Sequence, residues 1–458
     1  MKLELIKAVL LLWPLLVVLM FRTCGPRRAV LLAVIGGFLL LPPAQLKLHL
    51  PGFDFPLDKW NVNGVAMLAG CLLFGRRSPL PGRLHWVDLP IAAWYLAPLI
   101  GLVTGVTGAA ADIGDLMIGR GLGWVVPYAL ARLYFSDRDG PSDVAFALVL
   151  GGLVYVPICI YEQLAGPGNY LATQIYGIPH SGNVDRLGGW RPNGFLGDGL
   201  VLASWMAMTA VTATWLWLGR VRSSRLQSGI IALLLVLVTL SCRGVYGYLL
   251  LAAGLITAAL TSWRHSRIWL ICLAGVPVLY IGLRISGAWD GSILLNGADF
   301  AGRSGTVAFR LMAENEIISR VMGSHPLFGF GSYVWSANHE HFPDGGWLHA
   351  LWMGGCVGIA LWLVAMSLAP VAAALSRRQA GSGDMPRQFA AWSLACWCAL
   401  QSQDMLHNTS YMPPLSLVVG ALMGYAVWKP VRASGRTNPK TAPPAVVQTA
   451  AQSGWCDR

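Results

Sequence analysis

Residues 200–241 read LVLASWMAMTAVTATWLWLGRVRSSRLQSGIIALLLVLVTLS, two apolar runs separated by a basic cluster that contains Arg220, Arg222 and Arg225. A run of about 20 apolar residues is the length that an α-helix needs to cross the hydrocarbon core of a membrane. Neither run shows the alternation of polar and apolar residues that is typical of a membrane β-barrel strand. The stretch therefore predicts two transmembrane helices joined by a short basic loop.

The rest of the chain repeats this pattern. Of its 458 residues 55% are hydrophobic and 12% are charged, and the mean hydropathy is +0.56. This composition excludes an ordinary soluble domain and predicts an all-α, polytopic bundle, because a helix satisfies its own backbone hydrogen bonds in lipid. We predict about 12–13 spans of this length. They lie near residues 5–21, 29–44, 60–75, 86–104, 113–135, 143–162, 195–218, 227–241, 245–262, 268–286, 346–370, 388–404 and 411–428.

The basic residues indicate how the bundle is oriented. The net charge of +12 comes from short clusters between apolar runs, which excludes a nucleic-acid-binding protein and is typical of cytoplasmic loops. Residues 163–194 and 287–345 then form two long loops on the other side of the membrane. Residues 1–428 make a single transmembrane bundle, and residues 429–458 a disordered cytoplasmic tail. The clusters are Arg22, Arg27 and Arg28; Arg76, Arg77 and Arg83; Arg132 and Arg138; Arg220, Arg222 and Arg225; Arg264 and Arg267; and Arg377, Arg378 and Arg387.

A second group of arginines breaks this rule, because it lies on the extracytoplasmic side. One guanidinium group can bind two phosphate oxygens at once. Several arginines at the outer leaflet therefore predict a site for a lipid-linked phosphate or diphosphate. The alternative is that these arginines pair with local carboxylates such as Asp185, Asp299, Glu314 and Glu316. The group consists of Arg186, Arg191, Arg243, Arg284, Arg303, Arg310 and Arg320.

The large loop contains the segment FRLMAENEIISRVMGSHPLFGFGS, residues 309–332. Leu311, Ile317, Ile318 and Val321 recur at helical spacing, which predicts an amphipathic helix at the outer interface that ends before Pro326. In this prediction Arg310 opens the helix, where a cation opposes the helix dipole unless it faces an anion.

Several ionisable side chains surround the start of the eleventh span. Asp344 or an imidazole of His339 or His341 is placed to accept a proton from a sugar hydroxyl, and Asp344 alternatively caps the helix. The two histidines lack a clear third ligand, so we predict no metal site, and no cofactor is expected. Within the spans, Arg120 and Glu162 are expected to form an ion pair or to contribute to the lipid-phosphate path.

Four segments together resemble the bacterial O-antigen ligase and O-antigen polymerase superfamily. They are GGWRPNGFLGDG at residues 188–199, TLSCRGVYGYLL at 239–250, the FRLMAENEIISR and HPLFGFGS stretches of the large loop, and DGGWLHALWMGGCVG at 344–358. Each is degenerate alone, but their order and spacing match over about residues 186–360.

The resemblance implies a GT-C-like, multi-pass enzyme of the bacterial inner membrane with its active site facing the periplasm. Such enzymes move a glycan from undecaprenyl diphosphate to a hydroxyl of an acceptor sugar. Arg191, Arg243 and Arg310 match the arginines that would hold the diphosphate. Apart from the resemblance, the position of the other polar and aromatic residues at this side predicts Asp344 as the base. It also predicts that substrate is bound by Arg186, Arg303, Arg320, His339, His341 and Trp347.

The sequence departs from the ligase pattern at Asp344-Gly345, where ligases carry His-Asn, and at Cys242 in the Ser-Cys-Arg-Gly motif. The aspartate favours a polymerase of lipid-linked repeat units in exopolysaccharide or O-antigen synthesis, with the membrane lipid and a chain-length regulator protein as partners. Two alternatives stay open. One is an O-antigen ligase that transfers the polymer to lipid A core, with His339 or His341 as the base. The other, from a different class, is a flippase for lipid-linked oligosaccharide.

Overall fold

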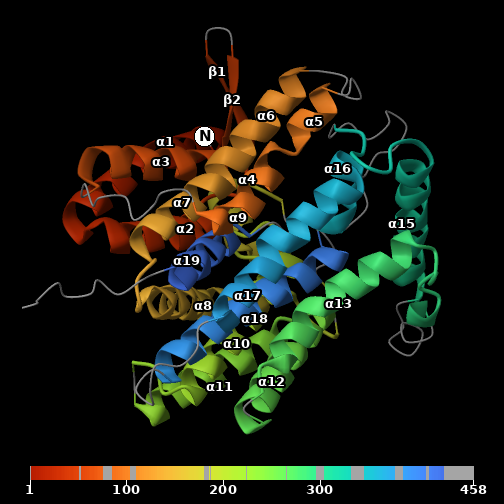
Figure 1. Ribbon diagram of the computed structural model, residues 1–458. Coiled ribbons are helices and arrows are strands. Elements are labelled where there is room, and N and C mark those ends of the chain that lie inside the picture. The colour runs from red at the N-terminus through yellow and green to blue at the C-terminus, as the bar shows by residue number, and fades with distance from the viewer. Residues whose placement is uncertain are drawn as a thin grey trace, which may run out of the picture.

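The computed structural model describes residues 2–50, 53–75, 85–103, 110–179, 185, 187–222, 224–264, 266–295, 304–331, 345–376, 385–408 and 412–427. Within them, six helical segments are long and apolar enough to cross a membrane, and Arg225–Ser241 and Pro414–Val427 are shorter apolar helices. The six are Lys2–Cys24, Gly140–Ala165, Gly199–Leu218, Val245–Arg264, Ile268–Ile285 and Gly346–Leu375. The chain is therefore an all-α protein built to cross a membrane several times, as the sequence predicts (Figure 1).

The N-terminal part packs α1 (Lys2–Cys24), α2 (Pro26–Leu40) and α3 (Lys59–Phe74) together. Between α2 and α3 the chain forms an antiparallel hairpin, β1 (Gln45–Leu50) and β2 (Phe53–Asp58), which the sequence analysis did not predict. The alternation in QLKLHL is a strand signal that a search for long apolar runs does not detect. Asp58 ends β2 and caps α3 by accepting the backbone N–H of Trp60 at 2.7 Å and of Asn61 at 2.9 Å.

The next two predicted spans are not single α-helices. The span 86–104 divides into a 3₁₀ turn (Trp86–Asp88), α4 (Leu89–Leu96) and α5 (Pro98–Val103), because Pro98 cannot donate the hydrogen bond that would continue α4. The span 113–135 consists of α6 (Ala110–Arg120), a π-helical turn (Gly121–Val125) and α7 (Val126–Tyr134). Pro127 is the second residue after the π turn, and a wider turn is one way for a helix to accommodate a proline.

The centre of the bundle is formed by α8 (Gly140–Ala165), α10 (Gly199–Leu218), α18 (Met385–His407) and α19 (Pro414–Val427). Side chains of α10, α18 and α19 are buried around almost the whole helix, which is the pattern of a helix enclosed by others. The short η3 (Pro167–Asn169) and α9 (Leu171–Tyr176) connect α8 to the segment that leads into α10.

Around this centre lie α11 (Arg225–Ser241), α12 (Val245–Arg264) and α13 (Ile268–Ile285). They expose large apolar side chains such as Leu233, Leu237, Leu249 and Leu279. A soluble protein rarely exposes apolar residues so densely, whereas lipid tails cover such a surface without cost.

The large loop contains the predicted helix, α15 (Ser304–Ser324). Leu311, Ile317 and Val321 are buried, and the helix ends before Pro326, as expected. One detail of the prediction is wrong: the helix begins at Ser304, so Arg310 does not open it but lies in its second turn. The start was missed because SGTV, residues 304–307, consists of weak helix formers.

After α15, the chain packs into a break in the backbone of the next helix, α16 (Gly346–Leu363). This helix continues through a π-helical turn (Val364–Leu368) into α17 (Ala369–Ser376), but its backbone is non-helical at Gly355, with φ 59° and ψ −156°. The segment Pro326–Gly331 fills this break. Phe330 and Gly331 donate to the carbonyls of Trp352 and Met353 at 2.7 and 3.2 Å, and Cys356 and Val357 donate to those of Pro326 and Leu327 at 2.9 and 3.1 Å. The broken helix thus keeps its backbone groups satisfied.

The break predicts that alanine substitutions at two neighbouring glycines have very different effects on stability. A Cβ at Gly355 would lie 2.5 Å from the Leu327 carbonyl oxygen and 2.6 Å from the Gly329 nitrogen, whereas a Cβ at Gly354 would meet no atom within 4 Å. Since Gly355 also has a positive φ, we expect Gly355→Ala to destabilise the protein by about 2–4 kcal/mol. Thermal unfolding in detergent measures this, with Gly354→Ala as the control. Equal midpoints for both variants would contradict the docked arrangement.

At one end of the bundle, arginines and aspartates join α2, α8, α18 and the loop between α10 and α11. Arg27 of α2 donates to Asp143 of α8 at 2.5 Å, and Arg387 of α18 donates to Asp139 at 2.7 Å. Arg222 also pairs with Asp143. The hydrogen bond from Arg387 lowers the pKa of Asp139, which keeps this pair ionised at neutral pH. Loops that the charge pattern assigns to the cytoplasm therefore lie together.

Candidate functional site

The other end of α8 holds the loop that contains Arg191. Glu162, fully buried near the end of α8, accepts the backbone N–H groups of Asn193 and Gly194, both at 2.8 Å, and of Leu171 at 2.9 Å. Glu162 therefore fixes the loop in place. Glu162 and Arg120 do not form the expected ion pair with each other. The guanidinium group of Arg120 instead lies over the ring of Trp94, 4.5 Å from its centre, and donates to the Trp94 carbonyl at 3.1 Å.

Arg191 lies against the N-terminus of α10. Its side chain is 4% exposed, and Nη2 is 3.8 Å from a carboxylate oxygen of Asp198, which also caps α10 by accepting the N–H of Leu200 at 2.8 Å. A Cβ at Gly199 would lie 2.5 Å from Arg191 Nε, so only glycine allows this approach. A guanidinium group and the positive end of a helix dipole thus lie together, with one carboxylate beside them, and this combination attracts anions.

Arg243 reaches the same loop from the turn between α11 and α12. Its Nη1 donates to the carbonyl of Leu187 at 3.0 Å, and its guanidinium group contacts Gly189, where a Cβ would collide with it. The backbone of Arg243 is left-handed, with φ 55°, a conformation that costs a non-glycine residue about 1–3 kcal/mol. The surrounding contacts maintain this strained turn, and they place Arg243 next to the segment that carries Arg191.

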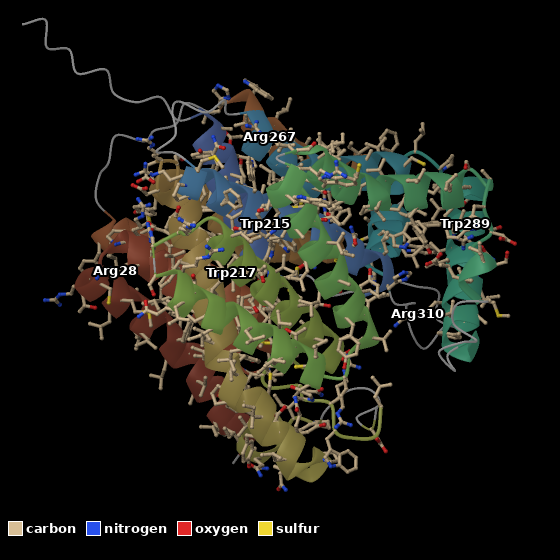
Figure 2. The ribbon with its side chains drawn as sticks, turned by 90° about the horizontal axis from the view of Figure 1, so that it is seen from below. Arg28, Trp215, Trp217, Arg267, Trp289 and Arg310 are labelled. Carbon is tan, nitrogen blue, oxygen red and sulfur yellow. The ribbon has the colours of Figure 1, made fainter. Side chains whose placement is uncertain are left out.

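Arg310 approaches from the large loop. It interacts electrostatically with Tyr246 in the first turn of α12, with Glu314 on its own helix and with His407 at the end of α18. Figure 2 shows Arg310 on the side of α15 that faces the bundle, far from Arg28 at the opposite side of the molecule. Arg191 and Arg243 therefore meet at one loop beside the start of α10, and Arg310 lies within electrostatic range of the first turn of α12.

Two other arginines of the large loop region pair with carboxylates, as the alternative interpretation anticipated. Arg284 of α13 donates to Glu314 at 3.0 Å and to the side-chain oxygen of Asn315 at 2.8 Å, and Tyr280 donates to the same carboxylate at 2.9 Å. This buried pair fastens α15 to α13. Arg320 forms an exposed pair with Glu316 at 2.6 Å, one turn away on α15.

Five of the predicted site residues lie outside the described residues: Arg186, Arg303, His339, His341 and Asp344. Trp347, expected to bind substrate, is fully buried in the first turn of α16, and its ring centre is 6.1 Å from that of Tyr280. Trp347 therefore packs inside the bundle in this structure.

One buried carboxylate was missed by sequence reasoning. Asp404, fully buried near the end of α18, accepts hydrogen bonds from Ser204 Oγ and Asn408 Nδ2, both at 2.6 Å. The backbone carbonyl of Asn408 in turn accepts the N–H of Gly346 at 2.9 Å. Asp404 therefore helps to fix the start of α16, two residues after Asp344. The signal was present in the polar run QSQDMLHN, residues 401–408, which interrupts an apolar span.

Aromatic and imidazole rings from α12, α13 and α18 pack against one another near this end of the bundle. The His407 ring lies 5.1 Å from that of Tyr246 and 6.0 Å from that of Tyr280, and the Tyr280 ring lies 5.6 Å from that of Trp289. Among the described residues, no three histidine, cysteine, aspartate or glutamate side chains gather as metal ligands would. Comparison with protein-family models, with curated proteins and with solved structures finds no match to this chain.

Proposed function

We propose that this chain is a membrane glycosyltransferase that uses a polyprenyl-diphosphate-linked oligosaccharide as its donor. The observation that carries the proposal is that Arg191 and Arg243 meet at one loop, with Arg310 in electrostatic range of the nearby start of α12. This loop lies at the end of α8 opposite the arginine–aspartate contacts of Asp139 and Asp143. The helix α8 connects the two ends, with Asp143 in its first turn and Glu162 near its last. If the basic loops are cytoplasmic, the three arginines face the periplasm of a bacterial inner membrane.

The proposed chemistry follows from the charges at this end. An acceptor hydroxyl oxygen attacks the anomeric carbon of the donor sugar, the bond from that carbon to the diphosphate oxygen breaks, and the diphosphate leaves with an additional negative charge. Preorganised guanidinium groups stabilise this charge more in the transition state than in the ground state. The N-terminus of α10 adds to the same positive field.

The proton of the acceptor hydroxyl needs a base, and we assign this role to Asp344, two residues before the start of α16. Asp404 would act on it indirectly, because it binds Asn408 and Asn408 binds the backbone of Gly346. We therefore treat Asp404 as a positioning residue. His339 or His341 would take over the role of base in the ligase alternative.

Among transferases, we favour a polymerase of repeat units over a ligase, because the aspartate at position 344 stands where the resembling ligases carry a histidine. The flippase alternative would need charges along a central path. The helices α10, α18 and α19 instead enclose mostly apolar side chains, and the arginines of the candidate site lie near one end.

A deletion strain separates these functions. Loss of a polymerase leaves surface glycan with a single repeat unit, and we expect this result. Loss of a ligase leaves long polymer that stays attached to the lipid carrier, and loss of a flippase leaves single lipid-linked units on the cytoplasmic side. Gel analysis of surface glycan together with extraction of lipid-linked material distinguishes all three. Unchanged glycan in both assays would contradict the transferase proposal.

A further inference from the structure

Two thiols lie against one another beside the arginine-bearing turns. The Sγ atoms of Cys159 on α8 and Cys242 at the end of α11 are 3.9 Å apart, and both residues are fully buried. A disulfide requires about 2.05 Å between the sulfur atoms. Rotation about the two Cα–Cβ bonds is the motion that would bring the two sulfur atoms together.

The backbone around the two cysteines is already held in register. Gln163 Nε2 donates to Ser241 Oγ at 3.1 Å, which joins α8 to α11 next to the two thiols. The N–H of Cys242 donates to the carbonyls of Val238 and Thr239 at 3.1 and 3.2 Å. The hydrogen bond between Gln163 and Ser241 therefore keeps the two helices, and with them the sulfur atoms, in proximity.

We propose that Cys159 and Cys242 are joined by a disulfide that fixes the Arg243 turn to α8. Each thiol loses its proton and the two sulfur atoms form a bond. The two electrons and two protons pass to the disulfide of an extracytoplasmic dithiol oxidase, which is reduced to its dithiol. The exchange takes place while the helix ends are still accessible during assembly, because thiols buried in apolar surroundings are inert in the folded protein. The oxidising compartment is the one that the charge pattern assigns to this end.

The bond would connect the two anchors of the candidate site. Cys159 lies one turn before Glu162, which holds the backbone of the Arg191 loop, and Cys242 directly precedes Arg243 in its strained conformation. A covalent link between them limits the movement of Arg243 relative to the loop that it contacts at Leu187. The disulfide thus has a structural role at the arginine cluster, whatever substrate the cluster binds.

The test is mass spectrometry of the full-length protein taken from membranes. Free thiols are blocked with N-ethylmaleimide in denaturant before any reduction, and the protein is then digested. We expect a linked peptide pair containing Cys159 and Cys242, lighter by two hydrogens than the two free peptides together. Reduction should abolish it, as should Cys159→Ser. Cys396 and Cys398 serve as an internal control, because two positions on one helix turn point in different directions and should both be blocked.

Complete blocking of Cys159 and Cys242 without reduction would overturn the proposal. In a host that lacks extracytoplasmic dithiol oxidases, by contrast, we expect both cysteines to be blocked completely, because nothing oxidises them. A linked pair that persists in such a host at full yield would overturn the proposed oxidant. Because the assay detects sulfur chemistry alone, its outcome is independent of glycan transfer.

Discussion

Replacing Arg191 by alanine is expected to lower the rate of glycan transfer by roughly 10²–10³-fold, with a smaller effect on the KM for the lipid-linked donor. The reason is that charge develops on the departing diphosphate, so a guanidinium group fixed beside it contributes mainly in the transition state. Arg191→Lys should recover only part of the rate, since an ammonium group cannot bind two phosphate oxygens at once. Turnover of a purified donor in detergent or nanodiscs measures the effect.

The variant should keep its fold, because the Arg191 loop is held through backbone groups. Glu162 accepts the N–H groups of Asn193 and Gly194, and Tyr170 donates to the Arg191 carbonyl at 2.5 Å. Arg264→Ala is the matched control: this arginine lies at the other end of α12 from Arg243, over the exposed ring of Trp263 at 4.8 Å. Equal turnover of Arg191→Ala and Arg264→Ala would contradict a role of Arg191 in the reaction.

Removing Glu314 is expected to destabilise the protein by about 3–5 kcal/mol, because it leaves the guanidinium group of Arg284 buried without its carboxylate. Both side chains are 2% exposed, and the contact is 3.0 Å. Arginine cannot lose its proton to relieve the cost. The midpoint of thermal unfolding should therefore fall strongly in Glu314→Ala, whereas Glu316→Ala, from the exposed pair with Arg320, should change stability by less than about 1 kcal/mol.

Removing Arg284 should have a different, pH-dependent effect. Burial already raises the pKa of Glu314 despite the presence of Arg284. Without the guanidinium group this pKa rises further, and the folded protein binds a proton that the unfolded chain releases above its ordinary value near 4.5. Stability of Arg284→Ala should then be greatest below that value and fall as pH rises through the folded pKa. Glu314→Ala should lack this dependence, so matching pH profiles for the two variants would contradict the assignment.

Much of the architecture can be predicted from the sequence, because a membrane imposes a length and a composition on each crossing helix. The helices α8, α10, α11, α12 and α13 lie close to their predicted bounds. Prolines and glycines account for the differences. Pro98 divides one predicted span, and Gly355 breaks another so that the Pro326–Gly331 segment can enter it. Such a docking joins residues far apart in the chain, and no local pattern predicts it.

The candidate site, too, could be predicted from the sequence only in part. The charge rule selected Arg191 and Arg243, which the fold brings to one loop, but the same rule selected Arg284, which forms a buried pair with Glu314. Sequence alone does not distinguish an arginine that meets an acidic partner from one that faces a ligand, because the partner comes from another helix. Asp404 was missed for the same reason: its contacts with Ser204 and with the start of α16 exist only in the folded bundle.

The most direct test of the central claim is the affinity of the purified protein for a polyprenyl diphosphate, measured beside the corresponding monophosphate and the uncharged polyprenol. Wild-type protein should bind the diphosphate most tightly. The variant in which Arg191, Arg243 and Arg310 are all alanine should lose most of this preference while its affinity for the polyprenol stays unchanged. A triple variant that still prefers the diphosphate as strongly as the wild type would show that these arginines do not form the binding site.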